Sequence, residues 1–447
     1  MTIADLNHKG EGVGRWHDRV VFVPDTVPGD RVLVRLVRVK PQYGQGKLHQ
    51  ILEAAIDRVR PSCIVADKCG GCQWQQVDYA RQLVTKQNLI LQDLQRIGGF
   101  AHPPVAEVLA GSTPLSYRNK ATYPIRRNSQ GLVQAGYYQK GSHQLINLNQ
   151  CPIQDDRLDP LLAQVKQDIQ QRGWSIYDEQ RHQGKIRHLS LRIGRRTGEV
   201  LLTLVSCSDQ LPGLAEQAER WLQVYPHLVG VCVNLNAART NAIFGSETVC
   251  VAGRPYLREI FAGLEFRIQS TTFFQVNTEQ AEALLQTIQS RLQLRGDEVL
   301  VDAYCGIGTL TLPMAQRVQQ AIGIEIQPEA IEQAEQNAQV NQIENVKFYV
   351  GQVETLLPNL EIGQTPDVIL LDPPRKGCEA TVMATLLQLQ APQIVYVSCN
   401  ASTLSRDLKQ LSGAYELNYV QPADFFPQTA HVEAAAFLRL RREEPEA

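Results

Sequence analysis

Hydrophobic segments near the end of the chain stop abruptly at reactive side chains, and this feature constrains the fold more than any other. Ile394-Val-Tyr-Val397 is rich in β-prone residues and is followed almost at once by Cys399. Val368-Ile-Leu-Leu371 leads in the same way into Asp372. Apolar strands of this kind are typical of a buried parallel sheet, in which ligands bind at the carboxyl ends of the strands. The pattern therefore predicts an α/β domain with Cys399 and Asp372 at one edge of its sheet.

The length of the chain predicts several domains. A chain of 447 residues is too long for one hydrophobic core. Changes in sequence texture place the boundaries at 1–58, 59–265 and 266–447. No stretch reaches the ~20 apolar residues of a membrane span, and the first residues lack the apolar run of a signal peptide. We therefore expect a cytoplasmic protein without a membrane partner.

Basic residues occur in stripes, although the chain as a whole has a formal net charge of -2. Residues 31–47 hold five Lys or Arg and no acid, residues 116–127 hold four, and residues 185–196 hold five. Such stripes on a balanced chain indicate a local footprint for a polyanion. A solvated surface explains any single stripe equally well.

Residues 8–56 alternate short β-prone runs with Gly- and Pro-rich turns. Val20-Val-Phe-Val23 and the run from Arg31 to Val39 predict strands, and the run from Lys47 to Glu53 can close the sheet. Short strands with exposed Lys and Arg are typical of an OB-like oligonucleotide-binding barrel, although a purely structural barrel has the same pattern. The segment resembles the TRAM domain, an RNA-binding module of RNA-modifying enzymes.

Four of the ten cysteines have a spacing typical of a metal site. Cys63, Cys69 and Cys72 form Cys-x5-Cys-x2-Cys, and the Gly-Gly turn inside it lets two thiolates converge on one centre. Cys151, which precedes a proline, is the best candidate for a fourth ligand. Four thiolates can hold zinc or an iron–sulfur cluster. A zinc ribbon would more often have two Cys-x2-Cys pairs, so this spacing favours a closed, structural [4Fe–4S] cluster.

A helical segment and then a β-rich region follow the first cysteines. Residues 78–100 predict an amphipathic helix, and the residues that recur at helical spacing are Tyr79, Leu83, Asn88, Leu91, Leu94 and Ile97. Strand-like segments lie at 117–124, 136–138, 188–193, 200–205 and 229–235. We interpret the remaining cysteines and the tryptophans of this region as packing residues. They are Cys207, Cys232, Cys250, Trp74, Trp174 and Trp221.

From about residue 270 strands and helices alternate, and the first strands indicate an adenosine-bearing cofactor. The strand that begins at Glu298 runs through Asp302 into the glycine turn Gly306-Ile-Gly308, where the backbone can approach a ligand closely. The next strand ends at Glu325, 23 residues after Asp302. A carboxylate at about 20 residues is placed to meet ribose hydroxyls. Gln352 follows a third strand, where an adenine contact is expected.

A nucleophilic cysteine beside such a pocket suits methylation at carbon 5 of a pyrimidine. That carbon becomes nucleophilic only after a group adds to carbon 6, which a thiolate can do. A base must then remove the carbon-5 proton before the thiol is eliminated. Cys399 and Glu433 supply both groups if the last strands fold back over the sheet edge, and Asp372 is placed to hydrogen-bond the base or the cofactor.

These motifs resemble those of the RNA 5-methyluridine methyltransferases, in particular the branch that acts on 23S ribosomal RNA. The resemblance spans essentially the whole chain. The tRNA-specific bacterial branch lacks both the barrel and the cluster cysteines, so their presence favours ribosomal RNA. The matching segments are Phe273-Phe-Gln-Val-Asn277, Asp302-x-Tyr-Cys-Gly-x-Gly308, Asp372-Pro-Pro-Arg-Lys-Gly377, Tyr396-Val-Ser-Cys-Asn400 and Phe426-Pro-Gln-Thr-x-His-Val-Glu433.

The resemblance implies an S-adenosylmethionine-dependent 23S rRNA (uracil-5-)-methyltransferase, and we expect a monomer. It implies a TRAM barrel, a β-rich central domain and a carboxyl-terminal Rossmann-like methyltransferase fold. Cys399 would be the nucleophile and Glu433 the proton-abstracting base. The residues implied to line the cofactor site are Gln275, Tyr304, Thr309, Glu325, Gln352 and Asp372. The residues implied to hold a [4Fe–4S] cluster are Cys63, Cys69, Cys72 and Cys151.

Some departures and alternatives remain beside this interpretation. Ala401 stands where the family often has Pro, and Thr309 stands where some relatives carry Asn. Asp-Pro-Pro also occurs in amino-group methyltransferases, but Arg375 occupies the place of the aromatic residue that those enzymes need. Cys305 fits packing beneath the cofactor loop better than catalysis, and His431 could share proton handling with the base. The same reaction on a tRNA uridine, or a non-catalytic RNA-binding protein with a sensing cluster, are the competing functions.

Overall fold

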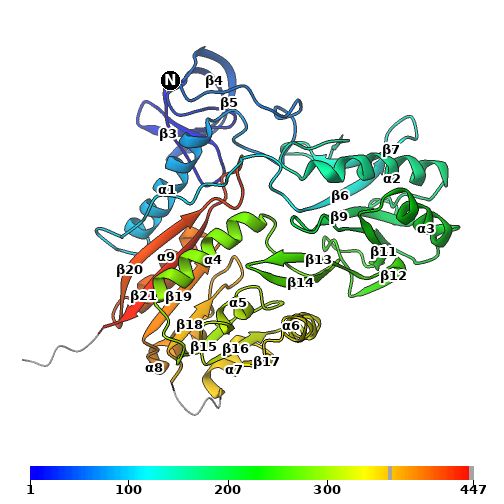
Figure 1. Cartoon of the computed structure of the whole chain (residues 1–447). Coiled ribbons are helices and arrows are strands. Elements are labelled where there is room, and N and C mark those ends of the chain that lie inside the picture. Colours follow the sequence, from blue (N-terminus) through cyan, green and yellow to red (C-terminus); the bar gives the residue numbers. More distant parts are fainter. Residues whose placement is uncertain (361–364, 442–447) are drawn as a thin grey trace, which may run out of the picture. The chain divides into compact units, whose positions relative to one another are not determined.

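The computed structural model describes residues 1–360 and 365–441, and within them the chain divides into two compact units (Figure 1). Unit 1 comprises Met1–Arg60, Gln73–Ser112 and Glu279–Ala447, and unit 2 comprises Pro61–Cys72 and Thr113–Thr278. Among the described helices, none combines the length and the apolar character that crossing a membrane requires.

The amino-terminal strands of unit 1 form a small barrel. The hydrogen-bonded order is β1-β2-β3-β5-β4, and a bridge between Thr2 and Arg31 joins the two outer strands. Val21 and Val32 are buried inside, whereas Val37 on the other side of β4 is 67% exposed. The barrel that the alternating β-prone runs predicted is confirmed. Its strands are β1 (Ile3–Leu6), β2 (Gly12–Trp16), β3 (Arg19–Val23), β4 (Arg31–Val39) and β5 (Tyr43–Glu53).

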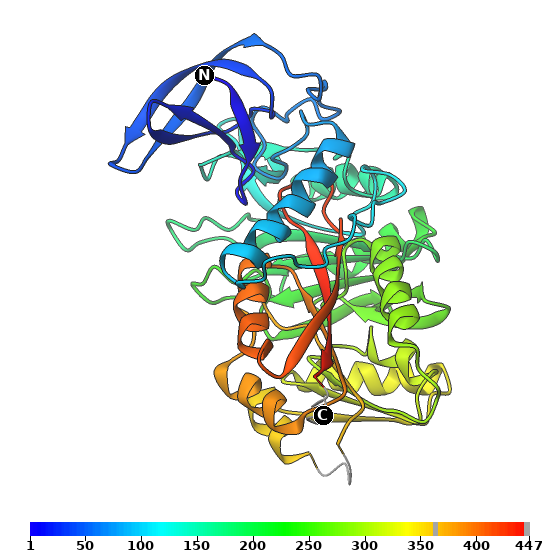
Figure 2. The ribbon, with the colours of Figure 1, turned by 90° about the vertical axis from the view of Figure 1, so that its left-hand side faces the viewer.

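Helix α1 (Tyr79–Arg96) follows the barrel in unit 1 and packs against α9 and β20, as Figure 2 shows. The predicted helix is confirmed, and of the residues predicted at helical spacing Leu94 is fully buried, but the buried face also contains polar residues that were not predicted. The structure buries Gln82, Lys86 and Asp93 and exposes Asn88. Hydrophobic spacing could not find this face because its polar side chains are buried by pairing with other segments.

The larger sheet of unit 1 has the strand order β17-β16-β15-β18-β19-β21-β20. The strands from β17 to β19 are parallel, and β21 runs antiparallel to both β19 and β20. Its strands are β15 (Val299–Ala303), β16 (Gln320–Glu325), β17 (Val346–Val350), β18 (Val368–Leu371), β19 (Gln393–Ser398), β20 (Tyr415–Ala423) and β21 (Glu433–Leu440). The strands predicted from residues 298, 321, 345, 367 and 394 onward are confirmed.

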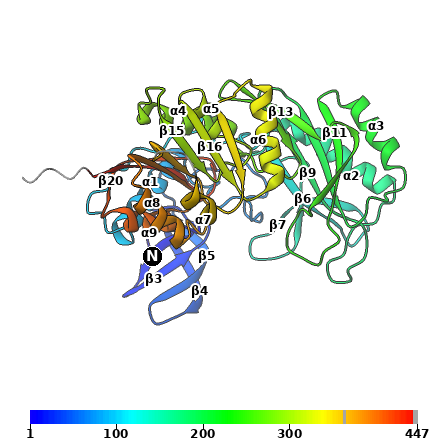
Figure 3. The ribbon, with the colours of Figure 1, turned by 90° about the horizontal axis from the view of Figure 1, so that it is seen from below.

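Helices cover both faces of this sheet, and Figure 3 shows α4 and α5 on one side and α8 and α9 on the other. The chain passes from β15 to β16 in one direction and from β15's other neighbour, β18, to β19 in the opposite direction. The carboxyl ends of β15 and β18 therefore flank the switch point at which ligands bind in such sheets. The helical segments are α4 (Thr278–Leu292), α5 (Thr311–Ala315), α6 (Pro328–Val340), α7 (Val353–Leu356), η2 (Leu357–Asn359), α8 (Ala380–Leu389) and α9 (Ala401–Leu411).

Unit 2 is built on a sheet of order β12-β11-β10-β9-β6-β7-β8, which is antiparallel except where β10 pairs with β11. A core with Trp174 and Trp221 joins the sheet to α2 and α3, which hydrophobic patterning did not predict. The strands are β6 (Lys120–Arg127), β7 (Val133–Tyr138), β8 (Leu145–Asn147), β9 (Ile186–Ile193), β10 (Val200–Ser206), β11 (Leu228–Leu235), β12 (Glu247–Gly253) and the hairpin β13 (Tyr256–Phe261) and β14 (Leu264–Gln269). The helical segments are η1 (Asp156–Leu158), α2 (Asp159–Gln171) and α3 (Leu214–Val224).

Candidate active site

Cys399 lies between the end of β19 and the start of α9. It is half-buried, and the next residue, Asn400, is the N-cap of the helix. The Asn400 side chain accepts a hydrogen bond from the Ser402 N–H at 3.1 Å and donates one to the Arg375 carbonyl at 3.2 Å. One amide therefore satisfies the helix terminus and ties the nucleophile's turn to the loop after β18.

Glu433 stands opposite Cys399. Strand β21 pairs antiparallel with β19 in a register that places Ser398 beside Ala434, so the next position on each strand is Cys399 and Glu433. Glu433 is 6% exposed. Burial, followed by the charge of Glu433, raises the pKa of the Cys399 thiol, and Arg375 opposes this shift. The last strand does not fold over the sheet edge as expected: β21 lies within the sheet, between β19 and β20, and its pairing with β19 brings these two groups together.

The pKa of the Glu433 carboxyl group lies close to neutral pH. Burial, and then the charge of Asp372, raise the pKa of Glu433 to about 8, with Arg375 again opposing. A carboxyl group with such a pKa can accept and release a proton near physiological pH, as a general base must. Burial, followed by Arg375 and Lys86, lowers the pKa of nearby His431. An imidazole with a lowered pKa is neutral at pH 7.

Asp372 is the first residue after β18, and side chains of α9 hold its loop in place. The Cys378 N–H donates to Asp407 Oδ2 at 3.0 Å, and the Tyr396 hydroxyl donates to the same oxygen at 2.6 Å. A Cβ at Gly377 would lie 2.5 Å from this oxygen, so the loop can pass only with glycine. Burial and the charge of Asp302 raise the pKa of Asp372 to about 7.

The glycine turn after β15 forms the second half of the site. Tyr304 has a φ of 107°, a strained conformation for a residue with a side chain, and the turn closes on the acid that ends β16. The Gly306 N–H donates to Glu325 Oε2 at 3.2 Å, and the Gln327 N–H donates to Oε1 at 3.0 Å. A Cβ at Gly306 would meet nothing within 4 Å, so open space lies beside the backbone of the turn.

Asp302 carries an unsatisfied buried oxygen in this turn. Its Oδ2 accepts a hydrogen bond from the Thr311 hydroxyl at 2.6 Å, while Oδ1 is buried without a partner among the described residues. Burial, and secondarily the charge of Glu325, raise the pKa of Asp302 to about 7. An orphaned buried oxygen beside two acids and an open backbone fits a polar, positively charged ligand such as S-adenosylmethionine.

The other predicted cofactor residues are less clearly engaged. Thr309 is half-buried in the same turn, and Gln352 is exposed at the N-cap of α7, with Gly351 between it and the end of β17. Gln275 belongs to unit 2, where its carbonyl accepts a hydrogen bond from Asn119 Nδ2 at 2.9 Å. Cys305 is 5% exposed and its sulfur lies against Gly323, which agrees with a packing role.

The four cysteines proposed as metal ligands all lie in unit 2. Burial, followed by the neighbouring Cys72, Cys63 and Cys69, raises the pKa of the Cys151 thiol to about 12, so the four thiols are close enough to interact electrostatically. The Cys69 sulfur accepts a hydrogen bond from the Gly71 N–H at 3.4 Å. The donor set suits a thiolate-bound centre, although within residues 1–360 and 365–441 no three His, Cys, Asp or Glu side chains have an arrangement that holds a metal ion.

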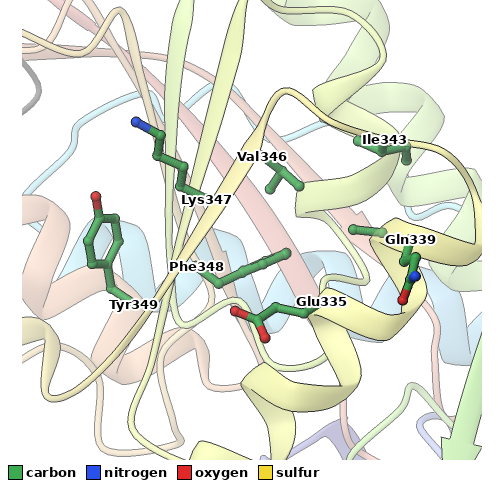
Figure 4. A pocket seen from close by; sticks show the side chains of 8 residues that line it. Glu335, Gln339, Ile343, Val346, Lys347, Phe348 and Tyr349 are labelled. Carbon is green, nitrogen blue, oxygen red and sulfur yellow. The ribbon is translucent and has the colours of Figure 1, made fainter.

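A surface groove in unit 1 is separate from these groups. It has a volume of about 500 Å³ and lies between α6 and β17, with Glu335 and Gln339 on the helix side (Figure 4). Phe348 lines it from β17, and the same ring packs against Gly323 beneath the cofactor turn. None of the predicted site residues lines this groove.

Some residues of the site were not singled out from the sequence. Arg375 acts to lower the pKa values of Cys399, Glu433 and His431. The signal for this residue in the sequence was its place in the Asp-Pro-Pro-Arg-Lys-Gly segment. Asp407 fixes the same loop from α9, but a single acid in an amphipathic helix gives no sequence signal for such a role.

The fold and the site together define an S-adenosylmethionine-dependent methyltransferase with an amino-terminal RNA-binding barrel. The tRNA (uracil-5-)-methyltransferase family matches residues 78–441, and the TRAM domain matches residues 1–49. The chain therefore belongs to the RNA uracil-5-methyltransferase family, and the family assignment made from the sequence motifs is confirmed.

Named relatives agree with this assignment. An uncharacterized RNA methyltransferase of Nostoc sp. is 66% identical over 98% of this chain and 96% of its own length. A second, from Synechocystis sp., is 56% identical over 98% of this chain and 95% of its own length. The solved structure of Pyrococcus abyssi tRNA (uracil-54, C5)-methyltransferase with S-adenosyl-L-homocysteine has a TM-score of 0.78 and 26% identity, covering 98% of this chain and 99% of that one.

Proposed function

We propose that this RNA methyltransferase methylates carbon 5 of a uridine in 23S ribosomal RNA through a covalent bond between Cys399 and carbon 6 of the base. The observation that carries the proposal is the pairing of β19 with β21, which places Cys399 opposite Glu433 beside the loop of Asp372. A thiol and a carboxyl group at adjacent strand ends supply the two functions that a carbon-5 substitution needs.

In the first half of the reaction the Cys399 thiolate adds to carbon 6. The new C–S bond draws its electrons from sulfur, and the electron pair of the former C5=C6 bond makes carbon 5 nucleophilic. Arg375 favours the thiolate against the effects of burial and of Glu433. Bound S-adenosylmethionine would supply the electrophilic methyl group, leaving as S-adenosylhomocysteine with the electron pair of the broken S–C bond.

In the second half the Glu433 carboxylate removes the carbon-5 proton. The C–H electron pair re-forms the C5=C6 bond, the C–S bond breaks, and the Cys399 thiolate departs with its electrons. Burial and Asp372 give Glu433 a pKa of about 8, which makes its carboxylate a stronger base than an exposed one. Water exclusion from the carboxylate, which is 6% exposed, preserves that basicity.

The residues proposed to bind S-adenosylmethionine are Gln275, Tyr304, Thr309, Glu325, Gln352 and Asp372. Glu325 and the open turn at Gly306 support the proposal most directly, since an acid at the end of a second strand suits ribose hydroxyls. Cys63, Cys69, Cys72 and Cys151 are proposed to hold a structural [4Fe–4S] cluster. Its role would be to tie residues 61–72 to residue 151 within unit 2.

The proposed division of labour follows the predicted boundaries. Residues 1–58 would bind RNA, residues 59–265 would carry the cluster and further RNA contacts, and residues 266–447 would perform methyl transfer. A tRNA uridine is the second candidate target, and the observation in its favour is that the Pyrococcus abyssi structure is of a tRNA (uracil-54, C5)-methyltransferase. The barrel and the four cysteines favour 23S ribosomal RNA.

A 5-fluorouridine substrate tests the chemistry. In the normal reaction carbon 5 loses a proton before the thiol is eliminated, and fluorine at that carbon cannot leave in the same way. A Cys399 adduct formed in the presence of S-adenosylmethionine would therefore persist on a denaturing gel. We expect an adduct with the wild-type protein and none with Cys399→Ala. An equal yield from the variant would overturn the mechanism. Parallel reactions on fluorinated 23S ribosomal RNA and tRNA would show which RNA is the target.

A further inference from the structure

One face of helix α1 in unit 1 carries buried polar side chains that the mechanism does not use. Gln82, Lys86 and Asp93 are each less than 9% exposed, although such residues are rarely buried unless they are paired. Spacings of four and seven residues bring all three to the same side of the helix. Each one hydrogen-bonds to a segment adjacent to Cys399 or Glu433.

Lys86 holds the segment that leads into Glu433. It is 0% exposed, and its Nζ donates to Asp424 Oδ1 at 2.5 Å and to the Phe426 carbonyl at 3.1 Å. The same ammonium lies 5.7 Å from the centre of the Trp74 ring. A buried cation with both hydrogen-bond acceptors in residues 424–426 fixes the start of the loop that ends at the base.

Gln82 holds the middle of the same loop. Its Nε2 donates to Gln428 Oε1 at 3.1 Å, and its own Oε1 accepts from the Gln428 N–H at 2.9 Å. Gln428 has a φ of 70°, which a residue with a side chain rarely adopts without such support. The Trp74 backbone N–H also donates to the Gln428 carbonyl at 3.0 Å, so both backbone polar groups of Gln428 are engaged.

Asp93 holds the helix that begins after the nucleophile. Its Oδ2 accepts a hydrogen bond from the Ser402 hydroxyl at 2.6 Å, three residues beyond Cys399. Its Oδ1 pairs with His8 Nε2 of the amino-terminal barrel at 3.2 Å. Ser402 can bond to Asp93 and to Asn400 at the same time, because its hydroxyl donates to Asp93 and its backbone N–H donates to Asn400.

We propose that this polar face of α1 is a clamp that sets the geometry of both catalytic loops, with Lys86 and Gln82 as positioning residues for Glu433 and Asp93 as a positioning residue for Cys399. The inference rests on the proposed function and adds residues to it. Stability alone does not require such a face, since buried ion pairs are often replaced by apolar residues at no cost. What the pairs provide is a single geometry for two loops that come from different parts of the chain.

The two halves of the reaction can be measured separately, and this distinguishes the residues that position Cys399 from those that position Glu433. Adduct formation on 5-fluorouridine RNA requires Cys399 but not proton removal, whereas turnover on ordinary uridine requires Glu433 as well. In full-length Lys86→Gln we expect adduct formation within about threefold of wild type. Turnover should fall by about 10-fold to 100-fold, because a 1 Å displacement of a catalytic group can cost about 10²-fold. The covalent intermediate should then accumulate on ordinary uridine.

Ile90→Ala is the matched control, because Ile90 is fully buried in α1 and packs in the hydrophobic core. It should lower the melting temperature without changing the ratio of adduct formation to turnover. If Lys86→Gln lowers both rates equally, as a general loss of stability would, the clamp is disproved. If wild type forms no adduct on 5-fluorouridine RNA, the proposed function fails independently of the clamp.

Two further variants keep the inference testable if Lys86→Gln does not fold. Gln82→Leu breaks the paired amides without leaving a buried charge, and it should show the same asymmetry at about threefold to tenfold in turnover. Ser402→Ala should have the reverse effect and slow adduct formation, while Ser402→Thr, which keeps the hydroxyl, restores it. Equal effects of Gln82→Leu and Ser402→Ala on both steps would overturn the separate roles.

Discussion

The sheet that carries Cys399 and the sheet of unit 2 treat buried polar groups in different ways. In the unit 1 sheet the buried and half-buried acids stand at or next to strand ends, as Asp302, Asp372 and Glu433 do. In unit 2 buried polar residues also lie within the strands, as Ser190 in β9 and Thr203 in β10 do. Arg192 in β9 is 4% exposed and is paired in register with Lys120 of β6. The buried acids of the unit 1 sheet thus stand near strand ends, whereas buried polar side chains of the unit 2 sheet also occur inside the strands.

This difference explains why candidate site residues could be singled out in unit 1, whereas in unit 2 the sequence predicted strands but not their buried polar pairs. A polar residue after an apolar run marks a strand end by itself, whereas a polar residue inside a strand depends on its cross-strand neighbours. Arg192, for example, is held by the Thr272 carbonyl at 2.7 Å, a partner 80 residues away.

The largest difference in methyl transfer should be between replacing a cysteine at a strand end and replacing a cysteine inside a strand. Cys399→Ala should reduce methyl transfer to background, because it removes the thiolate that adds to carbon 6 in the proposed reaction. Cys232→Ala is the matched change, since Cys232 is buried within β11 of unit 2. It should leave kcat within about twofold and cost only stability. Transfer of a labelled methyl group to RNA measures both, and comparable losses in the two folded variants would break the contrast.

Removing the acid at the end of β16 should weaken the binding of S-adenosylmethionine. Glu325→Gln removes the charge that two backbone N–H groups orient, and hydrogen bonds to charged groups contribute about 1.5–3 kcal/mol. We expect the Kd for S-adenosylmethionine to rise about 10-fold to 100-fold by calorimetry. Glu332→Gln on the exposed side of α6 is the control and should bind as wild type does. Unchanged affinity in Glu325→Gln would remove this residue from the site.

The pH dependence of turnover should follow Glu433. The carboxylate is the active form, and its pKa is raised to about 8 by burial and by Asp372. When proton removal limits the rate, turnover should therefore fall about tenfold for each pH unit below about 8. Asp372→Asn removes a negative neighbour, so the midpoint should move to lower pH. Steady-state rates from pH 6 to 9 test this, and a midpoint unaffected by Asp372→Asn would argue against the coupling.

The smallest effect concerns Lys120 at the start of β6 in unit 2. Burial, and then Arg192 and Arg118, lower the pKa of Lys120 to about 6. The unfolded chain therefore binds the extra proton between pH 6 and about 10, and the stability contribution of Lys120 rises with pH across that window. Lys120→Met should remove the rise and increase Tm at pH 7 by about 2–4 °C. Exposed Lys347→Met should do neither, and a lower Tm in Lys120→Met would contradict the burial argument.

The sequence was most informative where local pattern and function coincide. The strands of the parallel sheet, the barrel and the turn at Gly306 follow from apolar runs and glycine spacing, and Cys399, Asp372 and Glu433 could be singled out because reactive side chains end or begin strands. The buried polar residues of α1 could not be predicted, since hydrophobic periodicity assigns Lys86 to solvent. Its partner Asp424 lies 338 residues further on, and no local rule connects them.

Cys399, after the end of β19, and Glu433, at the start of β21, are proposed to act one after the other as nucleophile and base. The Glu433→Gln variant tests this most directly. Incubated with S-adenosylmethionine and RNA that contains ordinary uridine, this variant should methylate the base and then stall. Mass spectrometry of the digested complex should find the Cys399 peptide joined to a methylated nucleotide. Free 5-methyluridine produced at the wild-type rate, with no such adduct, would contradict the account and assign the proton removal to another residue.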